Sequence, residues 1–490
     1  MRLTVKDMDI ATGGISVAVL NQKDAADLDL HHEDRISIKK NKRKITTILD
    51  LAESQKAVPE GKIGLFEESL ALLKAKNNDE VTIKLEEKPA SVQYIKKKLN
   101  KEKLNYREFE EITKDIANNK LSLVELTHFV SACYTNGLDI KETIALTKAM
   151  VNSGKKMEIK GKVMDLHCIG GVPGNRTTMV VVPIIAAAGL TIPKTSSRAI
   201  TSPAGTADTM ETLAKVDLDF RKMRSVVKKT NGCIVWGGAM SLAPADDKII
   251  RIEYPLGIDA EGQLLASVMS KKKAVSSKYL LIDIPIGKTT KVKTRKDAER
   301  MKNKFKRIGK ELGIKVKAII TDGSQPIGNG IGPVLEAEDC MQVLKNAKNQ
   351  PKDLKEKAVM LAGMLLEMGR KTRKGKEDAM KILESGEAYK KMKQIIKEQG
   401  PVRTPRKGKE TYTYCATKSG KITEIDNFDI TKIARLAGAP KDQGAGIYLH
   451  RHAGEKISKG EKIFTIYSEN REKLRHAKTF LEQKDGIKIS

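Results

Sequence analysis

The chain has 490 residues, of which 40% are hydrophobic and 31% charged, a balance typical of a soluble protein with roughly two to four domains. No apolar run approaches the ~18 residues of a transmembrane helix, and the N-terminus lacks the apolar core of a secretory signal, so we expect a cytoplasmic protein with no membrane partner. The net charge of +29 suggests an acidic partner, but the lysines are spread along the whole chain and aromatic residues are only 4%. We therefore predict no nucleic-acid partner, and a basic RNA-binding protein is kept only as an alternative of a different class.

The cysteines and other possible metal ligands indicate no cofactor. The five cysteines are odd in number and widely scattered, which argues against a disulfide framework or a zinc site and suits a reducing compartment. No cluster of histidine, aspartate and glutamate suggests a metal site.

Residues 1–88 are predicted to form a separate β-rich domain. Turn residues separate short strands expected at Arg2–Thr4, Ile15–Leu20, Arg35–Lys39, Lys44–Leu49 and Glu80–Leu85, with one helix at Leu65–Lys74. The charged tract 39–44 is interpreted as a hairpin tip. No catalytic constellation occurs in this segment, so we expect it to serve assembly into a homodimer or larger homo-oligomer.

Residues 89–158 are predicted to form a helical domain. Apolar residues recur at spacings of three and four, and the periodic segments stop at asparagine or glycine. His128 falls on the apolar side of one such helix, which predicts a packed core histidine rather than a catalytic one.

Two loops suited to phosphate follow within about fifty residues of each other. Residues 170–178 and 196–206 each lie between a predicted strand and a predicted helix. Glycines allow backbone N–H groups to approach an anion, hydroxyl groups add donors, and a helix N-terminus supplies partial positive charge. Each loop also contains an arginine, Arg176 in the first and Arg198 in the second. Together the loops predict substrates with two phosphate groups.

Three ordered motifs resemble those of the thymidine and pyrimidine-nucleoside phosphorylases, over roughly residues 90–490. The motifs are Asp165-x-His167-x-x-Gly170-Gly171-Val172, Ser196-Ser197-Arg198-Ala199-Ile200-x-x-x-Ala204-Gly205-Thr206-x-Asp208-x-Met210-Glu211, and Ser241-Leu242-Ala243-Pro244-Ala245-Asp246. Anthranilate phosphoribosyltransferases share the general fold but use a diphosphate–magnesium leaving group. The nearest acidic pair for that metal is Asp246-Asp247, and its context fits the phosphorylases better.

The first motif departs from the family pattern. Where nucleoside phosphorylases carry Asp-Lys-His-Ser, this chain has Asp165-Leu166-His167-Cys168, so the lysine and serine expected to hold the attacking phosphate are absent. Pro173 looks like an insertion, and about ninety residues precede the family's segment. These features resemble the AMP phosphorylase branch, which acts on nucleoside 5′-monophosphates. The resemblance implies phosphorolysis of AMP, CMP and UMP by inorganic phosphate, giving free base and ribose 1,5-bisphosphate. The alternative is a pyrimidine-nucleoside phosphorylase that forms ribose or deoxyribose 1-phosphate.

The resemblance also implies a multidomain α/β fold. The helical domain is expected to be discontinuous, with its second part at about 242–275. The α/β phosphate-binding domain is expected at 159–241 and 276–400, with a mixed sheet. A linker at 400–408 would then lead to an α+β domain at 409–490.

The candidate general acid is Asp259. Apolar residues and glycine turns flank its carboxyl group, which could raise its pKa and keep it protonated for transfer to the departing base. The resemblance points to the same position as proton donor, and the alternative is a helix N-cap.

The candidate substrate contacts come from both loops and two later segments. Ser267 and Lys271 lie one helical turn apart and look like the family's base contacts. Lys291 follows a buried strand and could reach a phosphate, with Lys288 as its rival, while the roles of His167 and Cys168 stay open. Arg198 is a candidate bidentate phosphate clamp. The remaining candidates supply backbone, hydroxyl or packing contacts, and they are Gly171, Ser197, Ala199, Ile200, Thr201, Ser202 and Thr206.

Overall fold

A computed structural model of the chain describes residues 1–13, 16–258, 260–370, 373–484 and 486–490. The chain divides into two compact units. Unit 1 combines Met1–Gly154 with Ala243–Ser267, and unit 2 combines Lys155–Leu242 with Val268–Ser490. Each is described by itself below. Among the described residues, no helix combines the length and the apolar character that crossing a bilayer requires.

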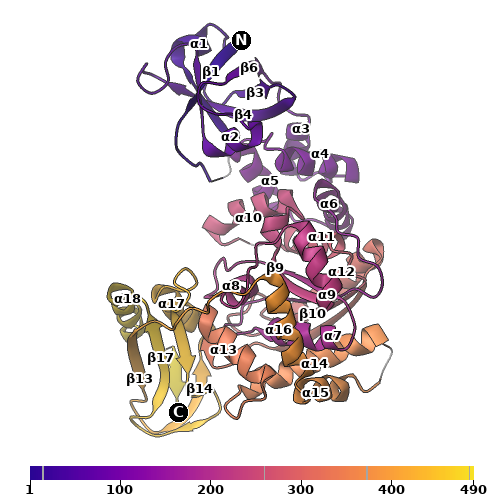
Figure 1. The fold of residues 1–490 in the computed structure, drawn as a ribbon, viewed down its shortest axis with the longest axis vertical. Helices are drawn as coiled ribbons and strands as arrows, with labels where there is room; N and C mark the ends of the chain where they lie inside the picture. The colour runs from indigo at the N-terminus through magenta and orange to yellow at the C-terminus, as the bar shows by residue number, and fades with distance from the viewer. Residues whose placement is uncertain (14–15, 259, 371–372, 485) are drawn as a thin grey trace. The chain divides into compact units, whose positions relative to one another are not determined.

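The first part of unit 1 is a closed six-stranded barrel, drawn in indigo in Figure 1. Its strands are β1 (Arg2–Asp7), β2 (Val17–Asn21), β3 (Arg35–Lys40), β4 (Arg43–Ala52), β5 (Lys62–Leu65) and β6 (Glu80–Leu85), in the order β1-β5-β2-β4-β3-β6. Two helices accompany them, α1 (Gln22–Ala26) and α2 (Glu67–Leu73). The predicted hairpin tip is confirmed, because Lys40 pairs with Arg43 across the turn. Strand β5 and helix α1 were not expected from the sequence.

The second part of unit 1 is a helical bundle. It contains α3 (Ser91–Leu99), α4 (Tyr106–Ala117), α5 (Leu123–Asn136), α6 (Ile140–Ser153), α10 (Pro244–Leu256) and the first half of α11 (Glu261–Ala274). Three successive helices, α4 to α6, begin with reciprocal capping boxes, so the local sequence specifies where they start. Phe109 and Phe129 pack edge-to-face in the core.

The prediction for His128 is wrong. The residue lies on α5 but is exposed. The buried stripe of this helix instead runs through Leu126, Phe129, Val130 and Cys133. A histidine immediately before two core positions therefore falls just outside the buried face, because neighbouring helical residues point about 100° apart.

The centre of unit 2 is a set of parallel strands. These are β7 (Met164–Cys168), β8 (Ile192–Ser196), β9 (Gly232–Trp236), β10 (Tyr279–Ile286) and β11 (Lys315–Asp322). One sheet has the order β11-β10-β7 and the other pairs β8 with β9, and each of these pairings is parallel. The expectation of a mixed sheet is thus wrong for these strands. Helical segments separate consecutive strands, which is the connection that parallel pairing requires.

Helices cover these strands. They are α7 (Thr177–Ala187), α8 (Thr206–Glu211), α9 (Phe220–Thr230), the 3₁₀ helix η1 (Gly237–Met240), α12 (Arg295–Leu312), α13 (Pro333–Leu344), α14 (Lys352–Arg370), α15 (Gly375–Glu384) and α16 (Glu387–Gln399). Residues Thr177 to Ala186 of α7 are all buried. Because α7 packs against α14, α15 and α16, its apolar surface on every side is covered.

The last part of unit 2 has two antiparallel sheets and two helices. Their elements after residue 409 are drawn in yellow tones in Figure 1. Strand β12 (Gly330–Ile331) joins β13 (Glu410–Cys415), β15 (Gly446–Leu449) and β17 (Lys462–Ser468). The second sheet contains β14 (Gly420–Ile425), β16 (Lys456–Ile457) and β18 (Ile487–Ile489). Helices α17 (Asn427–Leu436) and α18 (Arg471–Glu482) pack against each other.

Candidate active site

The first loop joins β7 to α7, and its glycines are required by its shape. Gly170, Gly171 and Gly174 have φ of 96°, 89° and 72°, in the left-handed region that favours glycine. A Cβ atom on Gly171 would lie only 2.8 Å from Cα of Thr290 and 2.9 Å from the backbone N of Lys291. The structure therefore brings together two predicted site positions, Gly171 and Lys291, both of which are exposed.

Lys288 and Lys291, the two rival phosphate candidates, have different surroundings. The Lys288 side chain is exposed and forms a 3.2 Å ion pair with Glu424. It is thus engaged with the last part of the chain, whereas the backbone of Lys291 abuts the first loop.

The second loop joins β8 to α8 and closes tightly on itself. A Cβ atom on Gly205 would lie 2.6 Å from the carbonyl oxygen of Ser197 and 2.7 Å from the backbone N of Ala199. Asp208 accepts hydrogen bonds from the backbone N–H groups of Ala199 (2.7 Å) and Gly205 (2.8 Å). These two donors therefore hold the loop in shape. The other predicted residues are at or near the surface, with Ser197, Ile200 and Thr201 exposed and Ser202 and Thr206 half-buried.

The guanidinium group of Arg198 is engaged by carboxylates. Its two terminal nitrogens donate to Glu211 at 2.5 and 2.7 Å, and Asp208 and Asp217 lie within 3.4 Å. Hydrogen bonding to Glu211 raises the pKa of Arg198. The guanidinium also stacks over the Trp236 ring, 4.9 Å from its centroid. The planar fork predicted for a phosphate is thus occupied by Glu211 in this structure.

The arginine of the first loop is also compensated. Arg176 forms an ion pair with the fully buried side chain of Glu336, and it donates to the carbonyl oxygen of Ala204 in the second loop. Glu336 also accepts from the Thr209 hydroxyl and the Gly332 N–H, each at 3.1 Å. Arg176 therefore ties the two loops together, a role that the sequence did not indicate.

A lysine cluster beside His167 was missed by the sequence analysis. Lys272 donates to the buried carboxylate of Asp165 at 2.9 Å, and Lys194 donates to the carbonyl oxygen of Leu166 at 2.6 Å. Burial, reinforced by the charge of Lys272, lowers the pKa of Lys194 to about 7. Burial and the neighbouring lysines hold the pKa of His167 well below its usual value. The sequence did offer one signal for this cluster, because Lys194 is a charged residue at the end of the otherwise uncharged strand-like segment 190–194.

One predicted substrate contact, Ser267, lies in unit 1. The Ser267 hydroxyl donates to the buried carboxylate of Asp246 at 2.8 Å, which gives Asp246 a structural partner within the helical bundle. Asp259 lies outside the described residues. The helix that carries Ser267, α11, begins two residues later at Glu261.

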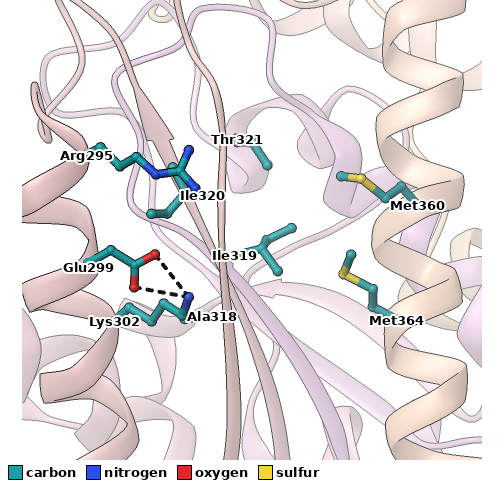
Figure 2. Close-up of a pocket in the computed structure, with 9 residues that line it drawn as sticks. All are labelled: Arg295, Glu299, Lys302, Ala318, Ile319, Ile320, Thr321, Met360 and Met364. Atoms are coloured by element: carbon teal, nitrogen blue, oxygen red, sulfur yellow. Dashed lines mark hydrogen bonds and ion pairs between the residues drawn. The ribbon is translucent and has the colours of Figure 1, made fainter.

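A pocket of about 320 Å³ lies elsewhere in unit 2, beside the edge strand β11. Figure 2 shows that Arg295, Glu299 and Lys302 of α12 lie on one side of this strand. Met360 and Met364 of α14 lie on the other side, facing Ile319. No described residue of either loop lines the pocket, so it is not the candidate site.

Comparisons with known proteins agree with the motifs. Residues 92–154 match "Glycosyl transferase family, helical bundle domain", residues 160–389 match "Glycosyl transferase family, a/b domain", and residues 421–489 match "Pyrimidine nucleoside phosphorylase C-terminal domain". An AMP phosphorylase of Pyrococcus furiosus is 46% identical to this chain, in an alignment that covers 100% of this chain and 98% of the length of that protein. The chain belongs to the pyrimidine-nucleoside phosphorylase family. It is accordingly a multidomain α/β protein and a phosphorylase of the pentosyltransferase type.

Relatives in this family carry two different names. An AMP phosphorylase of Thermococcus kodakarensis is 45% identical over 100% of this chain and 98% of its own. A putative thymidine phosphorylase of Legionella pneumophila is 46% identical over 93% of this chain and 89% of its own. A solved anthranilate phosphoribosyltransferase of Thermus thermophilus shares the fold, with a TM-score of 0.53 and 17% identity over 62% of this chain and 98% of its own.

Proposed function

We propose that this chain catalyses the phosphorolysis of AMP, and of CMP and UMP, by inorganic phosphate. The observation that carries the proposal is the 46% identity with an AMP phosphorylase along the whole chain, including the N-terminal residues. An oxygen of phosphate forms a bond to C1′ as the bond from C1′ to the base nitrogen breaks. The products are the free base and ribose 1,5-bisphosphate.

The changed first loop supports the nucleotide over the nucleoside as substrate. Leu166 and Cys168 stand where the nucleoside enzymes carry lysine and serine. A pyrimidine-nucleoside phosphorylase is the second candidate, and the similarity to putative thymidine phosphorylases favours it. That similarity covers 93% of the chain, against 100% for the AMP phosphorylase.

The proposed catalytic residue is Asp259, which would protonate the departing base while positive charge develops on the ribose. The proposed substrate contacts are Gly171, Ser197, Arg198, Ala199, Ile200, Thr201, Ser202, Thr206, Ser267 and Lys291. Within this set, we propose that Arg198 also holds the second loop in shape through its pair with Glu211. The reaction needs no cofactor beyond phosphate as co-substrate.

We further propose four domains with distinct roles. These are residues 1–88 for assembly, 89–158 with about 242–275 as the helical domain, 159–241 with 276–400 for phosphate binding, and 409–490 as the C-terminal domain. The free cysteines of the described chain suit a cytoplasmic enzyme.

Deleting residues 1–88 should leave a folded core that is at least dimeric but reduce any larger assembly. Light scattering that finds the same particle mass with and without the segment would reject the assembly role.

The function is tested by a substrate panel. The enzyme is incubated with phosphate and, separately, AMP, CMP, UMP, adenosine and thymidine, and free base is measured by chromatography. We expect base release from the monophosphates only in the presence of phosphate. Turnover of thymidine or adenosine equal to or faster than that of AMP would favour the second candidate.

A further inference from the structure

Helix α17, in the last part of unit 2, is anchored at the carboxyl ends of two of the parallel strands. At its start, the Asn427 side chain donates to the carbonyl oxygen of Gly323, directly after β11, at 2.9 Å. In its last turn, the Arg435 guanidinium donates to the carbonyl oxygen of Ile200, in the second loop after β8, at 2.8 Å. A parallel bridge just before β7 and β8 shows that these strands run the same way, so the carboxyl ends of β8 and β11 lie at one edge. Ligands of open α/β sheets bind at this edge.

Arg435 differs from the arginines of the two loops in its partners. Those arginines form ion pairs with carboxylates. For Arg435, the described part of the chain supplies no carboxylate within ion-pair distance, and its partner is a neutral carbonyl group. A cation in the last turn suits the negative end of the helix dipole, but that interaction requires no contact with another loop. The hydrogen bond to Ile200 is therefore a separate feature of this side chain.

The carbonyl group that Arg435 holds belongs to the peptide bond between Ile200 and Thr201. This bond is planar and trans, so its C=O and N–H groups point in opposite directions. Because the Ile200 carbonyl is held on the side of α17, the Thr201 N–H is directed away from that helix. Both residues are exposed, so this N–H group lies within reach of a ligand.

The other contacts of the second loop leave the N–H groups of residues 200–202 available. Asp208 accepts from one N–H group on each side of this segment. Arg176 donates to the carbonyl oxygen of Ala204. Among the residues that the structure describes, the backbone N–H groups of 200–202 have no acceptor. Free backbone N–H groups that follow one another in a loop are suited to the oxygens of a phosphate group.

We propose that Arg435 is a positioning residue for AMP, which holds the Ile200 carbonyl so that the Thr201 N–H is directed at the 5′-phosphate. This inference rests on the proposed function and adds to it a residue from the C-terminal part of the chain. Ile200 and Thr201 could be chosen as contacts from the sequence. The group that fixes the peptide between them comes from a helix more than two hundred residues later.

The kinetic test separates the two substrates of the proposed reaction. Arg435→Met removes the donors but keeps an apolar stem. We expect the KM for AMP to rise about tenfold, as for the loss of a hydrogen bond from a charged group, while the KM for inorganic phosphate stays within about twofold. An unchanged KM for AMP would overturn the positioning role. An equal rise in both KM values would also overturn it, because it would show a general loosening of the site.

Two further variants keep the test decisive. Arg435→Gln is also neutral but polar, so it covers the case in which Arg435→Met fails to fold, and the same rise in the KM for AMP is expected. Lys432→Met removes an exposed charge from the same helix and should match the unmodified enzyme. If Lys432→Met raises the KM for AMP as much as Arg435→Met does, the positive charge of the helix is responsible and the contact with Ile200 is not.

Failure of the proposed reaction is recognised in the unmodified enzyme. If that enzyme does not convert AMP, calorimetric titration with AMP replaces the kinetics. Weaker AMP binding by Arg435→Met, with unchanged binding by Lys432→Met, would then support the positioning role while the proposed function falls. Equal AMP binding by the unmodified protein and Arg435→Met would overturn the positioning role itself. An unmodified protein that does not bind AMP would overturn both.

Discussion

The arginines of the two loops and the lysine cluster beside the first loop are all cationic, but the structure places them in opposite electrostatic settings. Arg176 and Arg198 each face carboxylates, with Glu336 against the first and Glu211, Asp208 and Asp217 around the second. Lys272 instead donates to the carboxylate of Asp165, whereas the Lys194 ammonium donates to a neutral carbonyl group, that of Leu166. A cation in a phosphate-suited loop is therefore available to a ligand only if the fold leaves its charge uncompensated.

The largest effect we predict is on the turnover rate and comes from replacing the proposed general acid. Asp259→Asn keeps nearly the same size but has no proton to give to the departing base. We expect kcat for AMP to fall by ~10²–10⁴ with the fold retained and much of the AMP affinity intact. The loss should be smaller for a nucleotide whose base leaves readily without protonation. If both substrates slow by the same factor, Asp259 is a positioning or capping residue.

The next largest effect is on stability, and it tests whether the arginine of the first loop serves to neutralise a buried carboxylate. Arg176→Met leaves the fully buried Glu336 without its cation, which should lower the free energy of unfolding by about 3–5 kcal/mol. Losing the cation raises the folded-state pKa of Glu336 further. Above the pKa of an unfolded glutamate, the folded variant then keeps a proton on Glu336 that the unfolded chain releases. The loss of unfolding free energy relative to the unmodified protein should therefore grow as the pH rises from 5 to 8. Denaturant titration at both pH values measures this.

Two controls accompany that variant. Adding Glu336→Gln removes the uncompensated charge and should recover part of the stability. Arg475→Met breaks an exposed pair with Glu472 and should change stability by less than about 0.5 kcal/mol. A similar loss for Arg176→Met and Arg475→Met would show that Arg176 is not a structural brace.

The smallest predicted effect distinguishes a brace from a phosphate clamp at Arg198. The side chains of Arg198 and Glu211 are 32% and 30% exposed, so their pair should contribute only about 1 kcal/mol. If the pair holds the loop, Arg198→Ala and Glu211→Gln should each weaken AMP binding by about fivefold, and the double variant should be no worse. If Arg198 is a clamp, only its own replacement should weaken AMP binding, and Glu211→Gln should leave it unchanged or stronger.

Local patterns in the sequence predicted some of these features and could not predict others. The hairpin tip at 39–44 and the strand–loop–helix order of both loops are encoded by neighbouring residues, and the structure has them. The strand Lys62–Leu65 is only four residues long and was missed because it carries little periodic signal. The parallel pairing of β7 with β10 joins residues more than a hundred positions apart, which no local pattern specifies.

The same limit applies to the candidate site. Gly171 could be chosen because it is a glycine, and the structure adds that a Cβ atom at this position would meet the backbone of Lys291. The pairing of Arg176 with Glu336 depends on α13, which lies far along the chain, so the arginine was interpreted as a cation for the ligand. Lys194 was overlooked because its importance depends on which strand lies beside it.

The central claim is that two phosphate groups meet at one ribose, and labelled phosphate tests it most directly. The enzyme is incubated with unlabelled AMP and radiolabelled inorganic phosphate, and the sugar product is isolated and its phosphate content measured. We expect one labelled phosphate to be incorporated for each adenine released, in a ribose that also retains its unlabelled 5′-phosphate. Adenine release without incorporation of label, or incorporation from thymidine but not from AMP, would contradict the account.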